Sequence, residues 1–329
     1  MKRTIHTAQP DCSIIIATHN RLPMLKQALA SALVQRDVII EVLVVENGST
    51  DGTLAYLKEL GDPRVIPLIF EEALGATEAR NGGLRVAAGR WLAFLDDDDL
   101  WAPDKLSAQL KAMAAGGCDW SYTGCVYIDR DGVVMAGIPP LRPEEVAKLL
   151  PQRHAIPAGL SSMMWRAGVL DSDGLLDSGL TYMVDWDLSQ RLLRKGLPAC
   201  VPRPLVGYRQ HGANMSVRAG TYMSEMAVLD RKFADLRHGR SLDFAFQHRN
   251  AGSENLRAGH RRRALACYAR ALSLGDLGAV LRAAAVLVPM QAWPYLRKQI
   301  LADEAWMREG KGWLRELSPS GGGRVPAHL

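Results

Sequence analysis

The chain has 329 residues, of which 48% are hydrophobic and 23% charged, and its formal net charge is +5. This balance is typical of a soluble globular protein with a sizeable core, and no run reaches the roughly 18 uninterrupted apolar residues that cross a bilayer. The five cysteines are scattered and include no Cys-x-x-Cys pair, which argues against a structural zinc site and favours a reducing compartment.

Strand-like and helix-like segments alternate through the first hundred residues. The strands are predicted from continuous β-branched runs, and the helices from apolar residues at helical spacing, with Pro23 near one start and Gly89 at one stop. Such alternation predicts the α/β class, with a mostly parallel sheet and helices on both faces. In chain order we expect strand 13–20, helix 21–34, strand 39–45, helix 51–60, strand 65–70, helix 76–88 and strand 91–95.

The pattern is less regular from residue 100 to about residue 216, with a strand predicted at 120–128, a Pro-rich loop at 138–157 and a helix at 185–195. From Glu225 onward it is helical and rich in Ala, Leu and Arg, and 258–276 resembles one helix of a tetratricopeptide-type pair. We therefore expect four regions. These are an N-terminal extension (1–12), an α/β domain (13–216), a helical C-terminal region (217–317) and a disordered tail (318–329).

Four consecutive aspartates, residues 96–99, follow the apolar strand 91–95 and precede Trp101 and Pro103. Like charges this close repel one another, and a hard divalent cation is the simplest group that would hold them together. The carboxyl ends of strands are also where ligands bind in α/β sheets. A solvated acidic turn that caps the next helix is the alternative, and this segment by itself leaves both interpretations open.

Four motifs, taken in order, resemble those of family 2 glycosyltransferases. They are SIIIATHNR at 13–21, VVENGSTDGT at 44–53, GATEARNGGL at 75–84 and GRWLAFLDDDD at 89–99. The resemblance implies the GT-A fold, a Rossmann-like, mostly parallel sheet flanked by helices, here followed by a helical appendage. It also implies inverting transfer of a sugar from a nucleotide-diphosphate donor, assisted by Mn²⁺ or Mg²⁺.

The acidic run matches the metal motif of that family. The resemblance implies that Asp98 binds the metal, and that Asp96 contacts the ribose, or the metal through water. His211, in the segment VGYRQHGANMS, would complete the metal shell or contact the diphosphate. Asp97 is counted with the nucleotide site, although we expect its side chain to point away, and Asp99 is expected to support or cap the turn.

The nucleotide site is expected at the first two strand ends. His19 could stack on a pyrimidine, and Arg21 could neutralise phosphate. Asn47 could accept a hydrogen bond from a uracil or thymine ring, although Asn47-Gly48 also reads as a simple turn. Arg80 could reach the nucleotide or form a helix-surface salt bridge. The nucleotide-site residues implied by the resemblance are Thr18, His19, Arg21, Glu46, Asn47, Arg80, Asp96, Asp97 and Arg209, of which Arg209 would hold phosphate.

Asp185 matches the catalytic base of the family, which must take the proton of the acceptor hydroxyl. Asp185 and Asp187 also stand where acidic residues favour a helix N-terminus, and capping is compatible with catalysis. Val184 stands where the family usually has a glutamate. His154 lies in the expected acceptor loop, where a surface role is the default.

The predicted function is therefore glycosyl transfer to a saccharide or lipid-linked acceptor, in surface polysaccharide or glycolipid assembly. Alternatives are a sugar-1-phosphate nucleotidyltransferase, which should have a Gly-rich basic loop after its first strand, and a non-catalytic nucleotide-sugar-binding protein. The donor could be a UDP-, TDP- or GDP-sugar, and we expect no nucleic acid partner.

The first residues lack the apolar core of a signal peptide, so we expect a cytoplasmic protein that can lie at the inner membrane face. For the helices after residue 216 we favour core or dimer packing over peripheral membrane contact.

Overall fold

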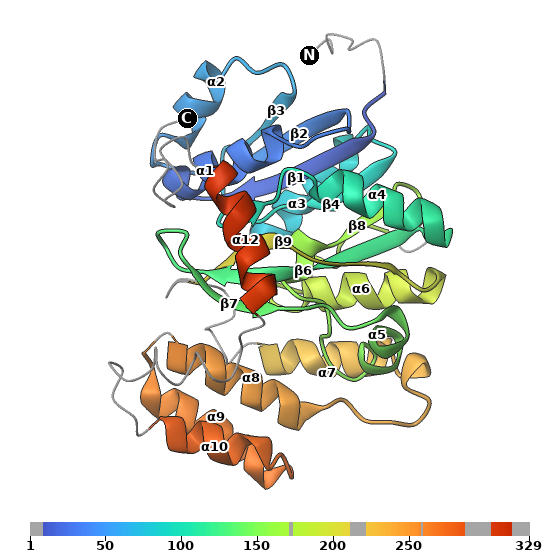
Figure 1. The fold of residues 1–329 in the computed structure, drawn as a ribbon, viewed down its shortest axis with the longest axis vertical. Helices are drawn as coiled ribbons and strands as arrows, with labels where there is room; N and C mark the ends of the chain where they lie inside the picture. The colour runs from blue at the N-terminus through green and yellow to red at the C-terminus, as the bar shows by residue number, and fades with distance from the viewer. Residues whose placement is uncertain (1–8, 171–173, 211–221, 258, 287–303, 318–329) are drawn as a thin grey trace.

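A computed structural model describes residues 9–170, 174–210, 222–257, 259–286 and 304–317. The fold is a nine-stranded mixed sheet with helices on both faces, followed by a layer of helices (Figure 1). The strand order is β3-β2-β1-β4-β8-β6-β9-β5, and β7 pairs with β6. The strands are β1 (Cys12–Thr18), β2 (Ile40–Asn47), β3 (Val65–Phe70), β4 (Trp91–Phe94), β5 (Leu100–Trp101), β6 (Trp120–Ile128), β7 (Val134–Ile138), β8 (Met164–Arg166) and β9 (Ala199–Arg209).

Helices cover both faces of the sheet. On one face α1, α2 and α4 pack against alternate residues of β1, such as Ile14 and Ile16. On the other face α3, α5 and α6 pack around Ile15. The described helices are α1 (Leu22–Leu33), α2 (Thr53–Glu59), α3 (Ala76–Val86), α4 (Lys105–Gly116), α5 (Pro143–Leu149), η1 (Gly159–Ser162), α6 (Val184–Lys195), α7 (Tyr222–Lys232), η4 (Asp235–Arg237), α8 (Phe244–Arg257), α9 (Arg261–Ser273), α10 (Gly278–Ala285) and α12 (Glu304–Glu316).

The first half of the sheet is the one expected from the sequence. Strand β1 pairs in parallel with β2 and β4, and β2 pairs in parallel with β3. Because both faces of β1 and β2 are covered, their sequences are continuously apolar rather than alternating. All the segments predicted between residues 13 and 95 are present, with boundaries shifted by a few residues, so the α/β class is confirmed.

The second half of the sheet is mixed, which was not expected. Strand β8 is antiparallel to both β4 and β6, and β5 is antiparallel to β9. Strands β6 and β9 are parallel. The two short strands β5 and β8 have two and three residues, too few for a periodic pattern to show in the sequence. This half carries the chain from the acidic turn to the helix that begins at Val184.

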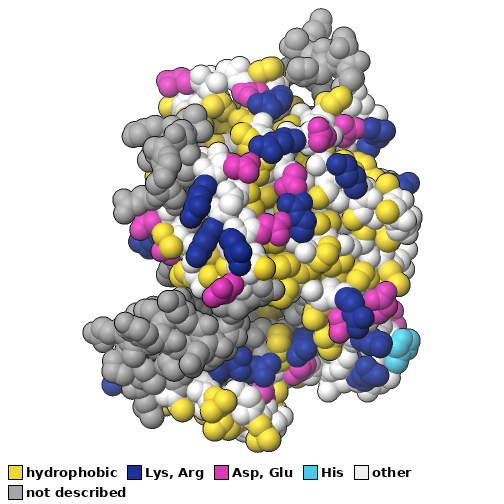
Figure 2. Space-filling view, viewed as in Figure 1, with side chains coloured by type: hydrophobic (Ala, Val, Ile, Leu, Met, Phe, Trp, Pro, Cys, Tyr) yellow, Lys and Arg dark blue, Asp and Glu magenta, His cyan; other side chains and the backbone are white. Residues whose placement is uncertain are grey.

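The C-terminal helices do not all stay together. Helices α8, α9 and α10 pack on one another below the sheet, and α9 buries Ala264 and Tyr268 (Figure 1). Hydrophobic side chains lie exposed over α10, where Leu277 and Leu281 are about four-fifths exposed (Figure 2). Helix α12 instead crosses back over the sheet and contacts β6, β7 and β9. None of the described helices is long and apolar enough to span a bilayer.

Glycine makes room for α12 on the sheet. A Cβ atom at Gly124 or at Gly137 would come within 2.4 Å of the Trp306 ring. The Trp313 indole N–H donates a hydrogen bond to the Pro204 carbonyl at 2.7 Å. The expected helical region 217–317 therefore contains one helix, α12, that packs directly on the sheet. The boundaries given above stay predictions, and 1–8 and the tail 318–329 lie outside the described residues.

A buried lysine stands at the start of α4. The Lys105 side chain is fully buried, and its Nζ lies 3.9 Å from the centroid of the Trp101 ring. Nζ has no hydrogen-bond partner among the described residues. Burial lowers the pKa of Lys105 to about 7. Between about pH 7 and the ordinary pKa of lysine, the unfolded chain therefore binds a proton that the folded chain has lost, so stability rises with pH there.

We expect Lys105→Met to raise the free energy of unfolding by roughly 3 to 5 kcal/mol at or below about pH 7, because the variant avoids desolvating an ammonium group. The gain should shrink as the pH rises toward 10, approximately the ordinary lysine pKa. Urea unfolding at several pH values measures both effects. Lys111→Met, at an exposed site on the same helix, is the control. An equal gain at all pH values would contradict the assignment.

Candidate functional site

A large pocket opens at the carboxyl ends of β1, β2 and β4. Its volume is about 940 Å³, large enough for a nucleotide-sized ligand and a second group beside it. The nucleotide loops predicted from the sequence form one end of the pocket, and α8 forms the other. The predicted site residues that line it are Thr18, His19, Arg21, Asn47, Arg80, Asp96, Asp97, Asp98 and Asp185.

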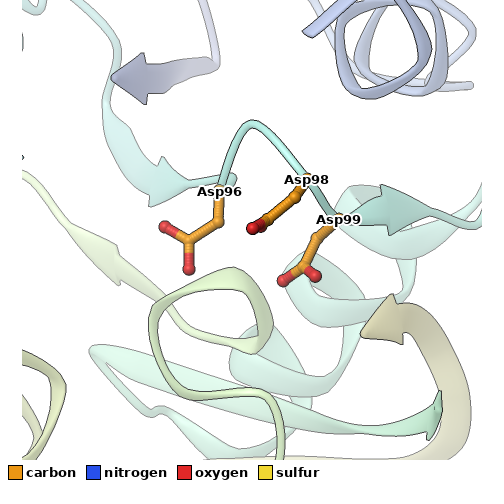
Figure 3. A group of neighbouring side chains, drawn as sticks. All are labelled: Asp96, Asp98 and Asp99. Atoms are coloured by element: carbon orange, nitrogen blue, oxygen red, sulfur yellow. The ribbon is translucent and has the colours of Figure 1, made fainter. Parts of the chain in front are cut away.

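The acidic run forms a tight turn between β4 and β5. Asp96, Asp98 and Asp99 each offer a carboxylate oxygen, and these oxygens lie within 4.8 Å of one another (Figure 3). The turn is closed by the Asp99 N–H, which donates to the Asp96 carbonyl at 3.0 Å. The Ser161 hydroxyl accepts from the Asp96 N–H at 3.1 Å. The turn therefore aims three carboxylates at one point, and Asp99 is one of them.

Burial makes this concentration of negative charge costly. Burial, together with the neighbouring Asp98, raises the pKa of Asp97 to about 6. Asp99 is fully buried, and burial raises its pKa well above the ordinary range, with Asp98 and Asp96 adding to the effect. Positive charge close to the turn is therefore needed to keep these carboxylates ionised.

Two arginines supply part of that charge. Arg21 Nη1 lies 3.0 Å from Asp97 Oδ1 and 2.7 Å from Asp98 Oδ2. Arg80, on α3, lies 2.5 Å from Asp96 Oδ1. Of the two alternatives left open for Arg80, the described structure shows a salt bridge, but one inside the pocket rather than on the helix surface. Arg21 and Arg80 both line the pocket.

The two nucleotide loops are held to each other. His19 Nδ1 lies 2.8 Å from the Asn47 carbonyl oxygen. The Asn47 side-chain oxygen already accepts the Leu74 N–H at 2.8 Å, and its second lone pair remains for a ligand. Glu46 is buried, binds the Ser49 N–H and does not line the pocket. The sequence predicted that Glu46 contacts the nucleotide, whereas in the structure Glu46 supports the loop.

Arg209 also differs from its expected place. Its side chain is 1% exposed, and its guanidinium donates to the Asp98 carbonyl at 2.8 Å and to the Arg130 carbonyl at 2.5 Å. Its own N–H donates to Asp99 at 2.9 Å. Arg209 lies under the acidic turn and is not among the pocket residues, so the structure places it as a support for the turn instead of a phosphate contact. His211 lies outside the described residues.

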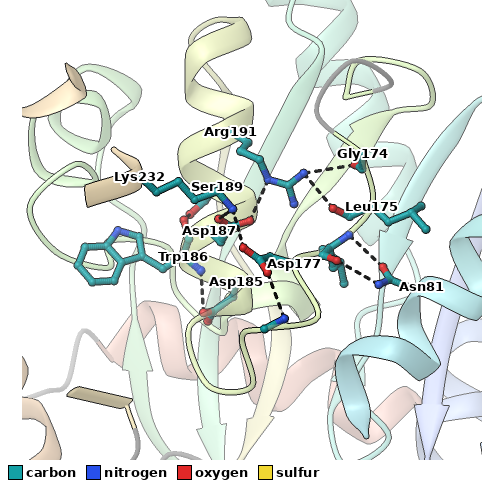
Figure 4. Close-up of polar contacts among 12 residues, drawn as sticks. Asn81, Gly174, Leu175, Asp177, Asp185, Trp186, Asp187, Ser189, Arg191 and Lys232 are labelled. Carbon is teal, nitrogen blue, oxygen red and sulfur yellow. Dashed lines mark hydrogen bonds and ion pairs between the residues drawn. The ribbon is translucent and has the colours of Figure 1, made fainter. Parts of the chain in front are cut away.

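Asp185 lines the same pocket as the acidic turn and lies at the start of α6 (Figure 4). Its Oδ1 accepts the N–H of the next residue, Trp186, at 2.7 Å. The N-cap position of α6 is Met183, and no side-chain hydrogen bond caps this helix. Its Oδ2 lies 3.3 Å from His154 Nε2. Asp187 faces away from the pocket and is fully buried, paired with Arg191 at 2.9 Å and Lys232 at 2.6 Å. The two aspartates therefore have separate roles.

Sequence patterns missed several groups that shape this side of the pocket. Glu225, on α7, accepts the N–H groups of Thr181, Tyr182 and Met183, and so fixes the loop before Asp185. His154 was expected at the surface, yet it lines the pocket. Helix α8 contributes further lining residues, namely Phe246, Gln247, Asn250, Ala251 and Glu254. No local motif marks these residues, because they reach the pocket only through tertiary packing.

Comparison with known proteins agrees with this geometry. The family model described as "Glycosyl transferase family 2" matches residues 13–167. The chain is 35% identical to the succinoglycan biosynthesis protein ExoO of Rhizobium meliloti over 37% of this chain and 35% of that protein. It is 37% identical to the Escherichia coli protein WfaP, named a UDP-Glc:alpha-D-GlcNAc-diphosphoundecaprenol beta-1,3-glucosyltransferase, over 37% of this chain and 48% of that protein.

Residues 13–167, just under half of the chain, are similar to glycosyl transferase family 2. The fold of the chain matches that of S. aureus TarS 1–349, solved in complex with UDP-GlcNAc, with a TM-score of 0.57 and 15% identity over 93% of this chain and 92% of that chain. This likeness concerns the fold, and it confirms the GT-A architecture with helices after it. The chain spans half the length, or less, of the curated relatives named above.

The acidic triad has the chemistry that a divalent cation requires in a family 2 site. Three carboxylate oxygens converge, and hard cations such as Mn²⁺ and Mg²⁺ prefer oxygen ligands. The depth at which Asp99 is buried also calls for a positive partner. The residues therefore fit a metal, and Asp99 is a better candidate ligand than its predicted supporting role suggested.

The two roles considered for Arg209 predict different outcomes for Arg209→Met. A support for the turn should cost about 3 kcal/mol or more of stability, because several buried carbonyl oxygens lose their donor. Urea unfolding measures this loss, and Arg130→Met, at an exposed position nearby, is the control. Unchanged stability combined with weaker UDP binding would instead establish the phosphate contact.

Proposed function

We propose that this chain is an inverting, metal-assisted glycosyltransferase that moves a sugar from a nucleotide-diphosphate donor to an acceptor hydroxyl. The single observation that carries the proposal is that Asp185, Asp96 and Asp98 line one pocket that also holds both nucleotide loops, with Asp99 buried beside Asp96 and Asp98. A base on one side and a leaving-group site on the other are what a single displacement needs. Attack from the side opposite the leaving group inverts the anomeric carbon.

Each group then has a task in the reaction. Asn47 and His19 hold the base end of the donor, and Arg21 and Arg80 face its phosphates. Asp96, Asp98 and Asp99 would hold Mn²⁺ or Mg²⁺, which supplies positive charge to the diphosphate leaving group. Asp185 Oδ2 accepts the proton of the acceptor hydroxyl as the new C–O bond forms.

The relatives support a bacterial surface polymer or glycolipid as the product. WfaP is named for a UDP-glucose donor and a diphosphoundecaprenol-linked acceptor, and ExoO for succinoglycan biosynthesis. We extend the class of reaction to this chain, with a saccharide or a lipid-linked saccharide as acceptor. Work at the inner face of the membrane would bring the chain to such an acceptor. The pocket volume leaves room for an acceptor group beside α8.

Removing the base should abolish turnover and leave donor binding intact. We expect Asp185→Asn to lower kcat for hydrolysis of the preferred sugar nucleotide by about 100- to 10,000-fold, because the amide cannot take a proton. The measurement is release of nucleoside diphosphate from UDP-glucose, UDP-GlcNAc, TDP-glucose and GDP-mannose with Mn²⁺. Thermal shift with UDP and Mn²⁺ should match the wild type. Turnover at the wild-type rate would overturn the role of Asp185.

Removing a metal ligand should act on binding as well. We expect UDP to stabilise the wild type against heat more strongly with Mn²⁺ than with EDTA, since cation and diphosphate bind together. Asp98→Asn should remove most of that difference. Glu59→Gln, which changes an exposed carboxylate on α2, is the matched control and should behave as wild type. An Asp98→Asn variant that keeps the full Mn²⁺ effect would refute the assigned metal site.

A further inference from the structure

We infer that His154 is a positioning residue for Asp185, an inference that rests on the proposed function and deepens it. His154 stands in the loop between α5 and η1, and its Nε2 lies 3.3 Å from Asp185 Oδ2. Both residues line the pocket, and their side chains are 23% and 29% exposed. Nothing in the sequence around His154 marks it for this place, because the contact joins segments about thirty residues apart.

The two oxygens of Asp185 have different surroundings. Oδ1 accepts the Trp186 N–H at 2.7 Å, so it is held by the helix that bears it. Oδ2 lies against Gly159, where an added Cβ would come within 2.5 Å of it. Gly159 also has a φ of +47°, which favours glycine. The backbone at Gly159 and the ring of His154 thus confine Oδ2, the atom left to face the acceptor.

The imidazole is suited to holding that oxygen. His154 Nε2 is buried, and it makes no well-aligned hydrogen bond to any described residue; Asp185 Oδ2 lies 3.3 Å away from it. A neutral imidazole that carries its proton on Nε2 would donate to Oδ2 and fix the carboxylate plane. A carboxylate oxygen can accept from His154 and still take a proton from an acceptor hydroxyl with its other lone pair. His154 therefore orients the base, and it neither gains nor loses a proton in the reaction.

Orientation of this kind affects the rate more than the binding. A small displacement of a catalytic group can lower turnover by about a hundredfold, while groups that bind the donor are untouched. His154 lies beside Asp185, whereas His19 and Asn47 contact each other in the nucleotide loops. Loss of His154 should therefore lower kcat and leave the KM for the donor nearly unchanged.

The test compares full-length variants in hydrolysis of the sugar nucleotide that the wild type turns over best among UDP-glucose, UDP-GlcNAc, TDP-glucose and GDP-mannose, with Mn²⁺. We expect His154→Ala to lower kcat by about 10- to 100-fold, with donor KM and the UDP thermal shift within about twofold of wild type. His154→Gln keeps an N–H donor and should recover most of the rate. His260→Ala removes an exposed imidazole on another surface and should have no effect.

A second variant approaches the same oxygen from its other side. Gly159→Ala should lower kcat to an extent similar to His154→Ala, because its Cβ forces Oδ2 aside. Thermal unfolding and UDP binding of each variant show that it is folded. If His154→Ala kept the wild-type kcat, or if it raised donor KM with kcat unchanged, the inference would be wrong although the proposed function stood. A wild type that consumes none of the donors would overturn the proposed function and the inference together.

Discussion

The site depends on one constraint, the cost of placing four consecutive carboxylates at the end of β4, two of which are buried. Asp97 and Asp99 are almost wholly buried, and water cannot screen them. Two arginines offset this cost: Arg21 pairs with Asp97 and Asp98, and Arg80 pairs with Asp96. Arg209 fastens the turn from beneath through backbone carbonyls. These arginines come from β9 and from segments after β1 and β3, so the turn ties together distant parts of the sheet.

A second buried charge network holds α6, the helix that carries Asp185. Asp187 is fully buried and is paired with Arg191 and Lys232, which anchors α6 to α7 (Figure 4). Lys232 also contacts Asp177 at 2.9 Å in the loop that precedes α6. Breaking such a network is costly because it leaves unpaired buried charge. The C-terminal helices are therefore not merely an appendage, since α7 sets the position of α6, the helix that carries Asp185.

The sequence was informative where the chemistry is local. Buried parallel strands are continuous apolar runs, so β1, β2 and β4 could be predicted, and with them the place of the acidic turn. The orientation within the turn was harder to predict, since only tertiary packing distinguishes a candidate metal ligand such as Asp99 from Asp97, which is paired with Arg21. The role of Arg209 depends on a contact with Arg130, about eighty residues away in the sequence. The position of His154 in the pocket depends on a contact with Asp185, about thirty residues away. Local sequence patterns carry no information about contacts between residues so far apart in the sequence.

The arginines bear on how a donor enters the proposed site. A diphosphate brings roughly two negative charges, and a divalent cation brings two positive ones, so adding both leaves the local charge balance almost unchanged. Arg21 and Arg80 can then remain close to the carboxylates and still face the phosphates. A diphosphate without a cation would instead compete with Asp96 and Asp98 for the same guanidinium groups. The observed pairing thus favours joint binding of cation and nucleotide over binding of either one first.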